Sequence, residues 1–178
     1  MRLISTPIAG AWLIDVEPIR DQRGFFARSI CVDVLAAQGL DGRISQQSIS
    51  FNERQGTLRG LHYQDEPHGE IKLVRATSGR IYDVILDLRP DSTSYLCWHA
   101  VELSVDNRRT LYVPKGVAHG FQTLEDNTEV FYQMTQRYVP GYSRGIRWND
   151  KKFAINWPLA VQSISLQDDS YPDYKLCP

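Results

Sequence analysis

A series of short, β-rich segments between residues 44 and 138 is the feature that most constrains the fold of this chain. Turn residues such as RPDST, VDNRR and LEDNT separate one segment from the next, a spacing typical of a sandwich or barrel. The segments span residues 44–50, 57–64, 71–79, 80–88, 95–103, 109–116 and 129–138. We therefore expect an all-β fold, an antiparallel jelly roll, because it closes two sheets around one core and leaves an interior that can hold a ligand.

Helical structure is expected to be scarce and short. In SICVDVLAAQGL, residues 29–40, Ile30, Val34 and Leu35 recur at helical spacing, and Gly39 stands where a C-terminal cap would. Three prolines after Trp157 predict an irregular tail. The 178 residues contain neither a repeat nor a low-complexity linker, so we expect a single domain over residues 1–178.

Composition and charge narrow the classes of partner. No apolar run approaches the roughly 20 residues that span a bilayer, and the N-terminal region lacks the continuous apolar core of a secretory signal. We therefore expect a soluble, cytoplasmic protein with no membrane partner. A net charge of -1 without a basic stripe argues against nucleic acid. Widely spaced Cys31, Cys97 and Cys177 predict free thiols rather than disulfides or a zinc site.

A resemblance to a known family rests on several segments that occur in the same order. PKGVAH, residues 114–119, is similar to the second cupin signature, whereas LHYQDEPHGE has Tyr63 and Gln64 where a metal cupin carries its second histidine ligand. DQRGFF, GTLRGLHYQ, KLVRATSGRIYDVILDLRPDS, VELSVDNRRTLYVPKGVAHGFQTLED and RGIRWND closely resemble the dTDP-4-dehydrorhamnose 3,5-epimerase family of metal-independent cupins. The resemblance implies an isomerase that acts on a nucleotide-linked 4-keto-6-deoxyhexose as a homodimer, with no cofactor and dTDP as the expected carrier.

Epimerisation beside a ketone needs a base, a group that stabilises the enolate oxygen, and an acid on the opposite face. The resemblance assigns the base to His62 and the acid to Tyr132. Asp168, in a Ser-x-x-Asp pattern with Pro172 four positions later, would hold the imidazole in one tautomer, and Lys72 would stabilise the enolate. The alternatives are a core histidine for His62, a solvated loop carboxylate for Asp168 and a surface lysine for Lys72.

Further residues are expected to bind the substrate. By resemblance, Arg23 and Arg59 form a diphosphate clamp, and Tyr138 stacks on the nucleobase. Arg59 and His62 have opposite strand parity, so we expect Gly60 to introduce a bulge that turns both inward. The other candidates are Phe26, Arg28, Gln46, Ser48, Asp83, His119 and Ser143, with core packing as the alternative for Phe26 and a buried hydrogen-bond acceptor as that for Asp83.

Four positions depart from the family pattern. Arg28 and Ser143 stand where glutamate is expected, Gln47 stands where aspartate is expected, and Ser48 stands where asparagine is expected. Because these changes alter charge and hydrogen bonding around the nucleotide, an epimerase that acts only at C3 or C5, or on another nucleotide sugar, is an alternative.

Two functions of other classes remain as alternatives. One is a metal-dependent cupin enzyme that uses His62, His68 or Glu70, and His119 as ligands. The other is a catalytically silent sugar-binding cupin, which the joint presence of base, orienting carboxylate, lysine and tyrosine argues against.

Overall fold

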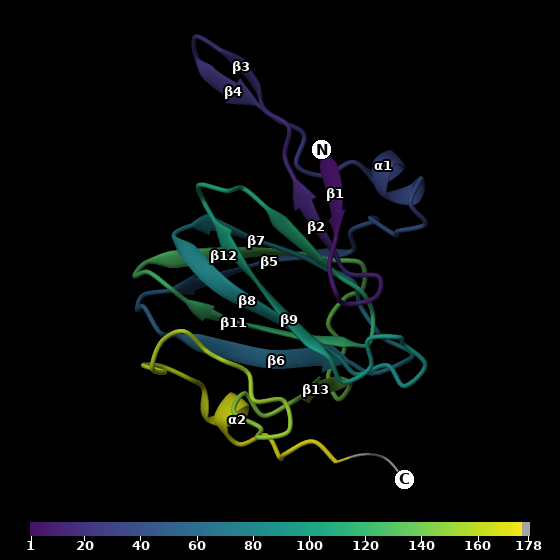
Figure 1. The fold of residues 1–178 in the computed structure, drawn as a ribbon, viewed down its shortest axis with the longest axis vertical. Coiled ribbons are helices and arrows are strands. Elements are labelled where there is room, and N and C mark those ends of the chain that lie inside the picture. The colour runs from purple at the N-terminus through teal and green to yellow at the C-terminus, as the bar shows by residue number, and fades with distance from the viewer. Residues whose placement is uncertain (176–178) are drawn as a thin grey trace.

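The computed structural model describes residues 1–175, and two antiparallel β-sheets face each other in it (Figure 1). The six-stranded sheet has the order β1 (Arg2–Ser5), β2 (Trp12–Asp15), β10 (Thr110–Val113), β7 (Lys72–Ser78), β12 (Thr128–Met134) and β5 (Gln46–Asn52). The five-stranded sheet has the order β13 (Ser143–Gly145), β6 (Leu58–Gln64), β11 (Val117–Thr123), β8 (Arg80–Asp87) and β9 (Trp98–Ser104). This architecture confirms the predicted all-β jelly roll.

The main hydrophobic core lies between the two sheets. Strand alternation directs one set of apolar side chains inward from each sheet, and these side chains are removed from solvent. They include Val74 and Val130 from the six-stranded sheet and Ile85 and Phe121 from the five-stranded sheet. Burial of this kind is worth about 1.5–3 kcal/mol for each large side chain, so the core fixes the spacing of the two sheets around any site between them.

The predicted helix is present but shorter than its sequence pattern suggested. Helix α1 spans Val32–Ala36, and Gly39 follows it with a φ of +71°. The Leu40 N–H donates to the carbonyl of Leu35, as a glycine-terminated helix end requires. Leu35 is fully buried against the outer face of the six-stranded sheet, so α1 covers that face. No helix within residues 1–175 is long and apolar enough to cross a membrane.

Several elements differ from the sequence prediction. Strand β11 was not predicted, and all of its residues are buried because it lies between β6 and β8 in the middle of a sheet. A strand buried on both faces has no polar alternation to reveal it. Strand β12 ends at Met134 rather than at residue 138, and the N-terminal strands were also missed.

A two-stranded hairpin extends away from the sandwich. It consists of β3 (Ile19–Asp21) and β4 (Gly24–Phe26), and Figure 1 shows it at the far end of the molecule from the C-terminal segment. Ile19 and Phe26 are 72% and 74% exposed, so this hairpin has an apolar surface that its own chain leaves open to solvent.

Candidate active site

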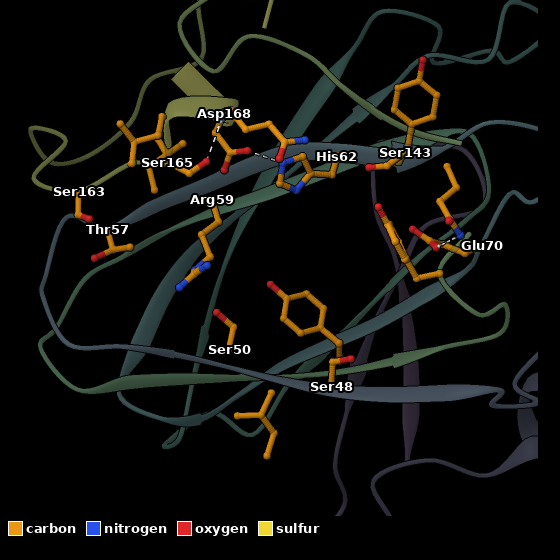
Figure 2. A pocket seen from close by; sticks show the side chains of 18 residues that line it. Ser48, Ser50, Thr57, Arg59, His62, Glu70, Ser143, Ser163, Ser165 and Asp168 are labelled. Atoms are coloured by element: carbon orange, nitrogen blue, oxygen red, sulfur yellow. Dashed lines mark hydrogen bonds and ion pairs between the residues drawn. The ribbon is translucent and has the colours of Figure 1, made fainter. Parts of the chain in front are cut away.

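A cavity of about 700 Å³ lies between strands of the two sheets and the C-terminal segment (Figure 2). Ser48 and Ser50 of β5 form one wall, and Arg59 and His62 of β6 face them from the other. A second chamber of about 280 Å³ shares Arg59, His62, Tyr132 and Tyr138 with the first. Ten of the predicted site residues line these two spaces, namely Gln46, Ser48, Arg59, His62, Lys72, His119, Tyr132, Tyr138, Ser143 and Asp168.

His62 forms a hydrogen-bonded pair with Asp168. The Nε2 atom of His62 lies 2.7 Å from Oδ1 of Asp168 (Figure 2), and the other carboxylate oxygen accepts the Gly60 N–H at 3.1 Å. Burial alone would raise the pKa of Asp168, but the hydrogen bonds from His62, Gly60 and Ser165 lower it below the ordinary value of 3.8. An ionised Asp168 accepts the proton on Nε2, so the lone pair of a neutral His62 is on Nδ1.

The C-terminal segment brings Asp168 to His62. This segment runs beside the start of β6, where the Leu58 N–H donates to the carbonyl of Ser163. Helix α2 (Leu166–Asp169) then begins with Ser165 as its N-cap, whose hydroxyl accepts the Asp168 N–H at 3.0 Å. The Ser-x-x-Asp pattern in the sequence is therefore a helix N-cap, and it also orients the Asp168 carboxylate toward His62.

Gly60 resolves the parity conflict between Arg59 and His62. His62 pairs with His119 of β11, whereas Arg59 pairs with Phe121, so β6 carries one extra residue in this interval. Gly60 has a φ of +112°, and a Cβ atom there would lie 2.6 Å from Cα of Gly120. The predicted bulge is confirmed, and it directs Arg59 and His62 into the same cavity (Figure 2).

Tyr132 approaches the cavity from the opposite sheet. It lies on β12, with Ser48 of β5 as its cross-strand neighbour. Burial raises the pKa of the Tyr132 phenol far above its ordinary value, and the negative charge of Asp83 acts in the same direction. Tyr132 therefore remains protonated at neutral pH and can donate a proton only to a strong base.

Asp83 lies behind His119 rather than in the wall of the cavity. Its Oδ2 atom is 2.9 Å from Nε2 of His119, and its side chain is fully buried. Burial raises the pKa of Asp83, although the neighbouring His119 and Lys72 act in the opposite direction. Asp83 thus fixes the ring of a cavity-lining histidine, as a buried hydrogen-bond acceptor would.

Lys72 lines the second chamber, and two oxygen atoms hold its ammonium. Its ammonium donates to the carbonyl of His62 at 3.0 Å and forms a 3.0 Å ion pair with Glu70. An ammonium has three donors, so one N–H remains for a ligand once these contacts are made within residues 1–175. The side chain is 12% exposed, which excludes the surface lysine that the sequence left open.

Two of the binding candidates, Arg59 and Tyr138, line both the first and the second chamber. Arg59 donates through Nε to Asn52 Oδ1 at 2.7 Å, which leaves its terminal nitrogens for an anion. Tyr138 is 57% exposed, and its backbone N–H donates to the side chain of Gln46. Tyr138 reaches the cavity through this loop and not by strand alternation, because β12 has already ended at Met134.

Besides Asp83, three predicted binding residues lie outside the cavity of their own chain. Arg23 is in the turn of the β3–β4 hairpin, where its side chain is 90% exposed and pairs with Asp21. Phe26 lies on β4, and its exposure excludes the core packing considered above. Arg28 follows the hairpin and contacts the sulfur of Cys31.

Sequence reasoning missed several polar residues of the cavity wall as parts of this site, among them Gln64 and Glu70. Gln64 shares strand parity with His62 on β6, so alternation was a signal that could have identified it, whereas Glu70 precedes β7 and follows no strand pattern. No group of three or more His, Cys, Asp or Glu side chains in residues 1–175 is arranged to hold a metal ion. Of the four residues considered as metal ligands, His62 is bonded to Asp168, His119 to Asp83 and Glu70 to Lys72, and the His68 ring packs edge-on against Tyr142.

Comparisons with known proteins fit this geometry. Residues 5–175 match the sequence profile described as dTDP-4-dehydrorhamnose 3,5-epimerase. The chain belongs to this family of sugar-nucleotide epimerases. The dTDP-4-dehydrorhamnose 3,5-epimerase of Methanothermobacter thermautotrophicus is 43% identical over 161 residues, which cover 90% of this chain and 85% of the relative.

Other relatives extend the comparison to bound ligands and to a second reaction. The crystal structure of the Bacillus anthracis 3,5-epimerase with TDP and PPi bound superimposes with a TM-score of 0.93 at 40% identity, and covers 97% of this chain and 99% of that one. A dTDP-4-dehydrorhamnose 3-epimerase of Streptomyces niveus is 36% identical, over 94% of this chain and 81% of the relative. Relatives of similar sequence identity to this chain are thus named either as 3,5-epimerases or as a 3-epimerase.

Proposed function

We propose that the protein is an isomerase that epimerises C3 and C5 of a dTDP-linked 4-keto-6-deoxyhexose. The observation that carries this proposal is the placement of the His62–Asp168 pair on one wall of the cavity and of Tyr132 on the other. Inversion requires proton removal on one face of a carbon and proton return on the opposite face, and a base and an acid from facing sheets meet that need. The family and the TDP bound in its Bacillus anthracis member support the substrate class.

In the proposed reaction, Nδ1 of His62 takes the proton beside the ketone while Asp168 holds the ring and stabilises the imidazolium. The free N–H of the Lys72 ammonium donates to the ketone oxygen, where charge grows as the enolate forms. Tyr132 then returns a proton from the other face. No oxidation or group transfer occurs, so the proton balance closes within these residues and solvent.

Arg59 and Tyr138 would hold the nucleotide part. The planar guanidinium of Arg59 suits a diphosphate, and the exposed ring of Tyr138 at the cavity wall suits stacking on a base. Ser48 and Ser143 line the same cavity, and their small hydroxyl groups would set the hydrogen bonds that the sugar nucleotide meets there.

A nuclear magnetic resonance experiment tests the reaction. The protein is incubated with dTDP-4-keto-6-deoxyglucose in heavy water, and the C3 and C5 protons are followed. Loss of both signals is expected, with His62→Ala as the inactive variant and His68→Ala, on the neighbouring loop, as the matched histidine control. Exchange at one carbon alone supports a single-centre epimerase, and no exchange with dTDP, CDP or GDP sugars rejects the function.

We also propose that the active form is a homodimer in which the β3–β4 hairpin serves the cavity of the partner. The support is that Arg23 and Phe26 lie far from the cavity of their own chain, while the edge strand β5 exposes Ile49 and Phe51 at 63% and 52%. Exposed apolar residues on an unpaired edge favour association with a second copy. The hairpin would then add Arg23 to the diphosphate clamp of the neighbouring site.

Mixed dimers distinguish this arrangement from a hairpin that folds back on its own chain. Arg23→Ala and His62→Ala variants, each inactive alone, are unfolded together and refolded together. If the hairpin crosses, half of the dimers regain one complete site, and about a quarter of wild-type activity returns. No recovery would contradict the crossing. Gel filtration measures the dimer itself, and cell fractionation tests the cytoplasmic location expected from the sequence.

A further inference from the structure

A buried bridge of two side chains connects Lys72 to the loop that carries Tyr138. Gln64 is 4% exposed, and its amide nitrogen donates to the carboxylate of Glu70, which is the partner of Lys72. The same amide nitrogen donates to the carbonyl of Arg137 at 3.2 Å, and its oxygen accepts the Val139 N–H at 2.8 Å. Both backbone neighbours of Tyr138 are therefore bonded to Gln64.

We infer that Gln64 and Glu70 are positioning residues that couple the nucleotide end of the cavity to the reacting centre. This inference rests on the proposed function, because Tyr138 is its stacking residue and Lys72 its enolate-stabilising cation. Glu70 contacts both halves: one oxygen pairs with Lys72 at 3.0 Å and the other accepts from Gln64. A nucleotide stacked on Tyr138 would restrict the motion of its loop. Through Gln64 and Glu70, this would also restrict the position of the Lys72 ammonium.

The burial of the bridge explains why its bonds are strong enough to transmit order. Glu70 is 10% exposed and Lys72 12%, so water competes little for either charge. A hydrogen bond to a charged group under these conditions contributes more than one between neutral groups. Binding energy from a part of the substrate that does not react can in this way be used at the carbon that does.

Two variants separate the halves of the bridge. Glu70→Gln keeps the size of the side chain and an acceptor for Gln64 but removes the negative charge from Lys72. We expect kcat to fall by about tenfold or more, while the Kd for dTDP stays within about threefold. Gln64→Met keeps the volume but removes all amide contacts. We expect dTDP to bind about tenfold more weakly and the Val139 amide to exchange with solvent about tenfold faster.

Asp65→Asn is the matched control. Asp65 lies on the loop between β6 and β7, as Glu70 does, but it forms a partly exposed ion pair with Arg144. Surface pairs of this kind contribute little, so all three measurements should match the wild type. A cooperative thermal melt checks that each variant folds. If Gln64→Met does not fold, Gln64→Asn, which shortens the reach of the amide by one methylene, tests the same bonds.

The results decide the inference in either direction. Unchanged dTDP affinity and Val139 exchange in the Gln64 variant overturn it, as does a Glu70→Gln enzyme with wild-type kcat. Amide exchange is measured without substrate, so it reports on the bridge even if the proposed reaction is wrong. A wild-type protein that neither binds dTDP nor exchanges sugar protons would reject the proposed function and, with it, the catalytic part of this inference.

Discussion

Replacement of Asp168 by asparagine tests the proposed base most directly. The Asp168 side chain is 7% exposed and accepts two N–H groups, at 2.7 Å from His62 and at 3.1 Å from Gly60. An amide of the same shape has only one acceptor oxygen, so its NH2 group must face one of these donors. Either the Gly60 N–H loses its partner, or Nε2 of His62 becomes an acceptor and the proton moves to Nδ1.

The two orientations of the amide predict measurable losses. An unpaired buried donor costs about 1–3 kcal/mol of unfolding free energy. A proton on Nδ1 removes the general base, which is worth about 10²–10⁴-fold in rate. We therefore expect Asp168→Asn to lower kcat at least about 100-fold, as measured by deuterium incorporation at C3, because a neutral amide in either orientation no longer stabilises the imidazolium. A loss of about 1–3 kcal/mol in the free energy of unfolding, measured in urea, accompanies the orientation that leaves the Gly60 N–H unpaired.

The neighbouring carboxylate supplies the control, and pH supplies a second test. Asp169 is exposed and accepts from the Trp148 indole at 3.1 Å, so Asp169→Asn should retain activity within about twofold. Because the pKa of Asp168 is lowered in the folded state, its contribution is present above the ordinary value of 3.8 and is lost as pH falls through the folded value. The difference in unfolding free energy between the wild type and Asp168→Asn should therefore become smaller in acid. An Asp168→Asn enzyme with more than about a tenth of wild-type activity would refute the assigned role.

Three further changes have defined outcomes. Tyr132→Phe should slow epimerisation more than solvent exchange, because the base still acts while the opposite-face acid is absent; equal loss of both rates by NMR would remove its special role. Gly60→Ala should lower the free energy of unfolding, measured from the urea midpoint, by at least about 2 kcal/mol. The new Cβ would lie 2.6 Å from Cα of Gly120, and the φ of +112° is one that alanine rarely adopts. An unchanged midpoint would contradict the bulge geometry assigned to Gly60. Burial opposes ionisation of Asp87, but hydrogen bonds from Arg89, Ser92 and Ser94 lower its pKa to about 2. Asp87→Asn should therefore lower the free energy of unfolding by about 2 kcal/mol at pH 7, as measured in urea, and a difference of this size that persists near pH 2 would contradict the explanation.

Two kinds of reasoning led from the sequence to the cavity residues. His62 and Asp168 were expected in the site from the family resemblance, and the structure brings their side chains together although they are 106 positions apart. The conflict between Arg59 and His62 was visible from strand alternation, and Gly60 was the residue able to relieve it. The bulge could be predicted because the residues that decide it lie within a few positions along the chain.

Other features depend on contacts between distant segments, and the sequence did not reveal them. Strand β11 is buried on both faces by its neighbours, so its residues show no alternation. Tyr138 reaches the cavity because the side chains of Gln46 and Gln64 hold its loop, although continued strand alternation had suggested the same location. The position of Arg23 outside its own cavity depends on the path of a hairpin, which no local pattern specifies.

The division of the site between two sheets has a consequence for how the chain acquires activity. His62 lies on β6 of the five-stranded sheet and Tyr132 on β12 of the six-stranded sheet, and the hydrophobic core between the sheets determines their separation. A refolding intermediate with both sheets formed but not yet docked would hold an intact histidine and an intact tyrosine and still be inert. Recovery of proton exchange after dilution from denaturant therefore cannot precede the docking of the two sheets, and in the proposed homodimer it also requires the hairpin of the partner.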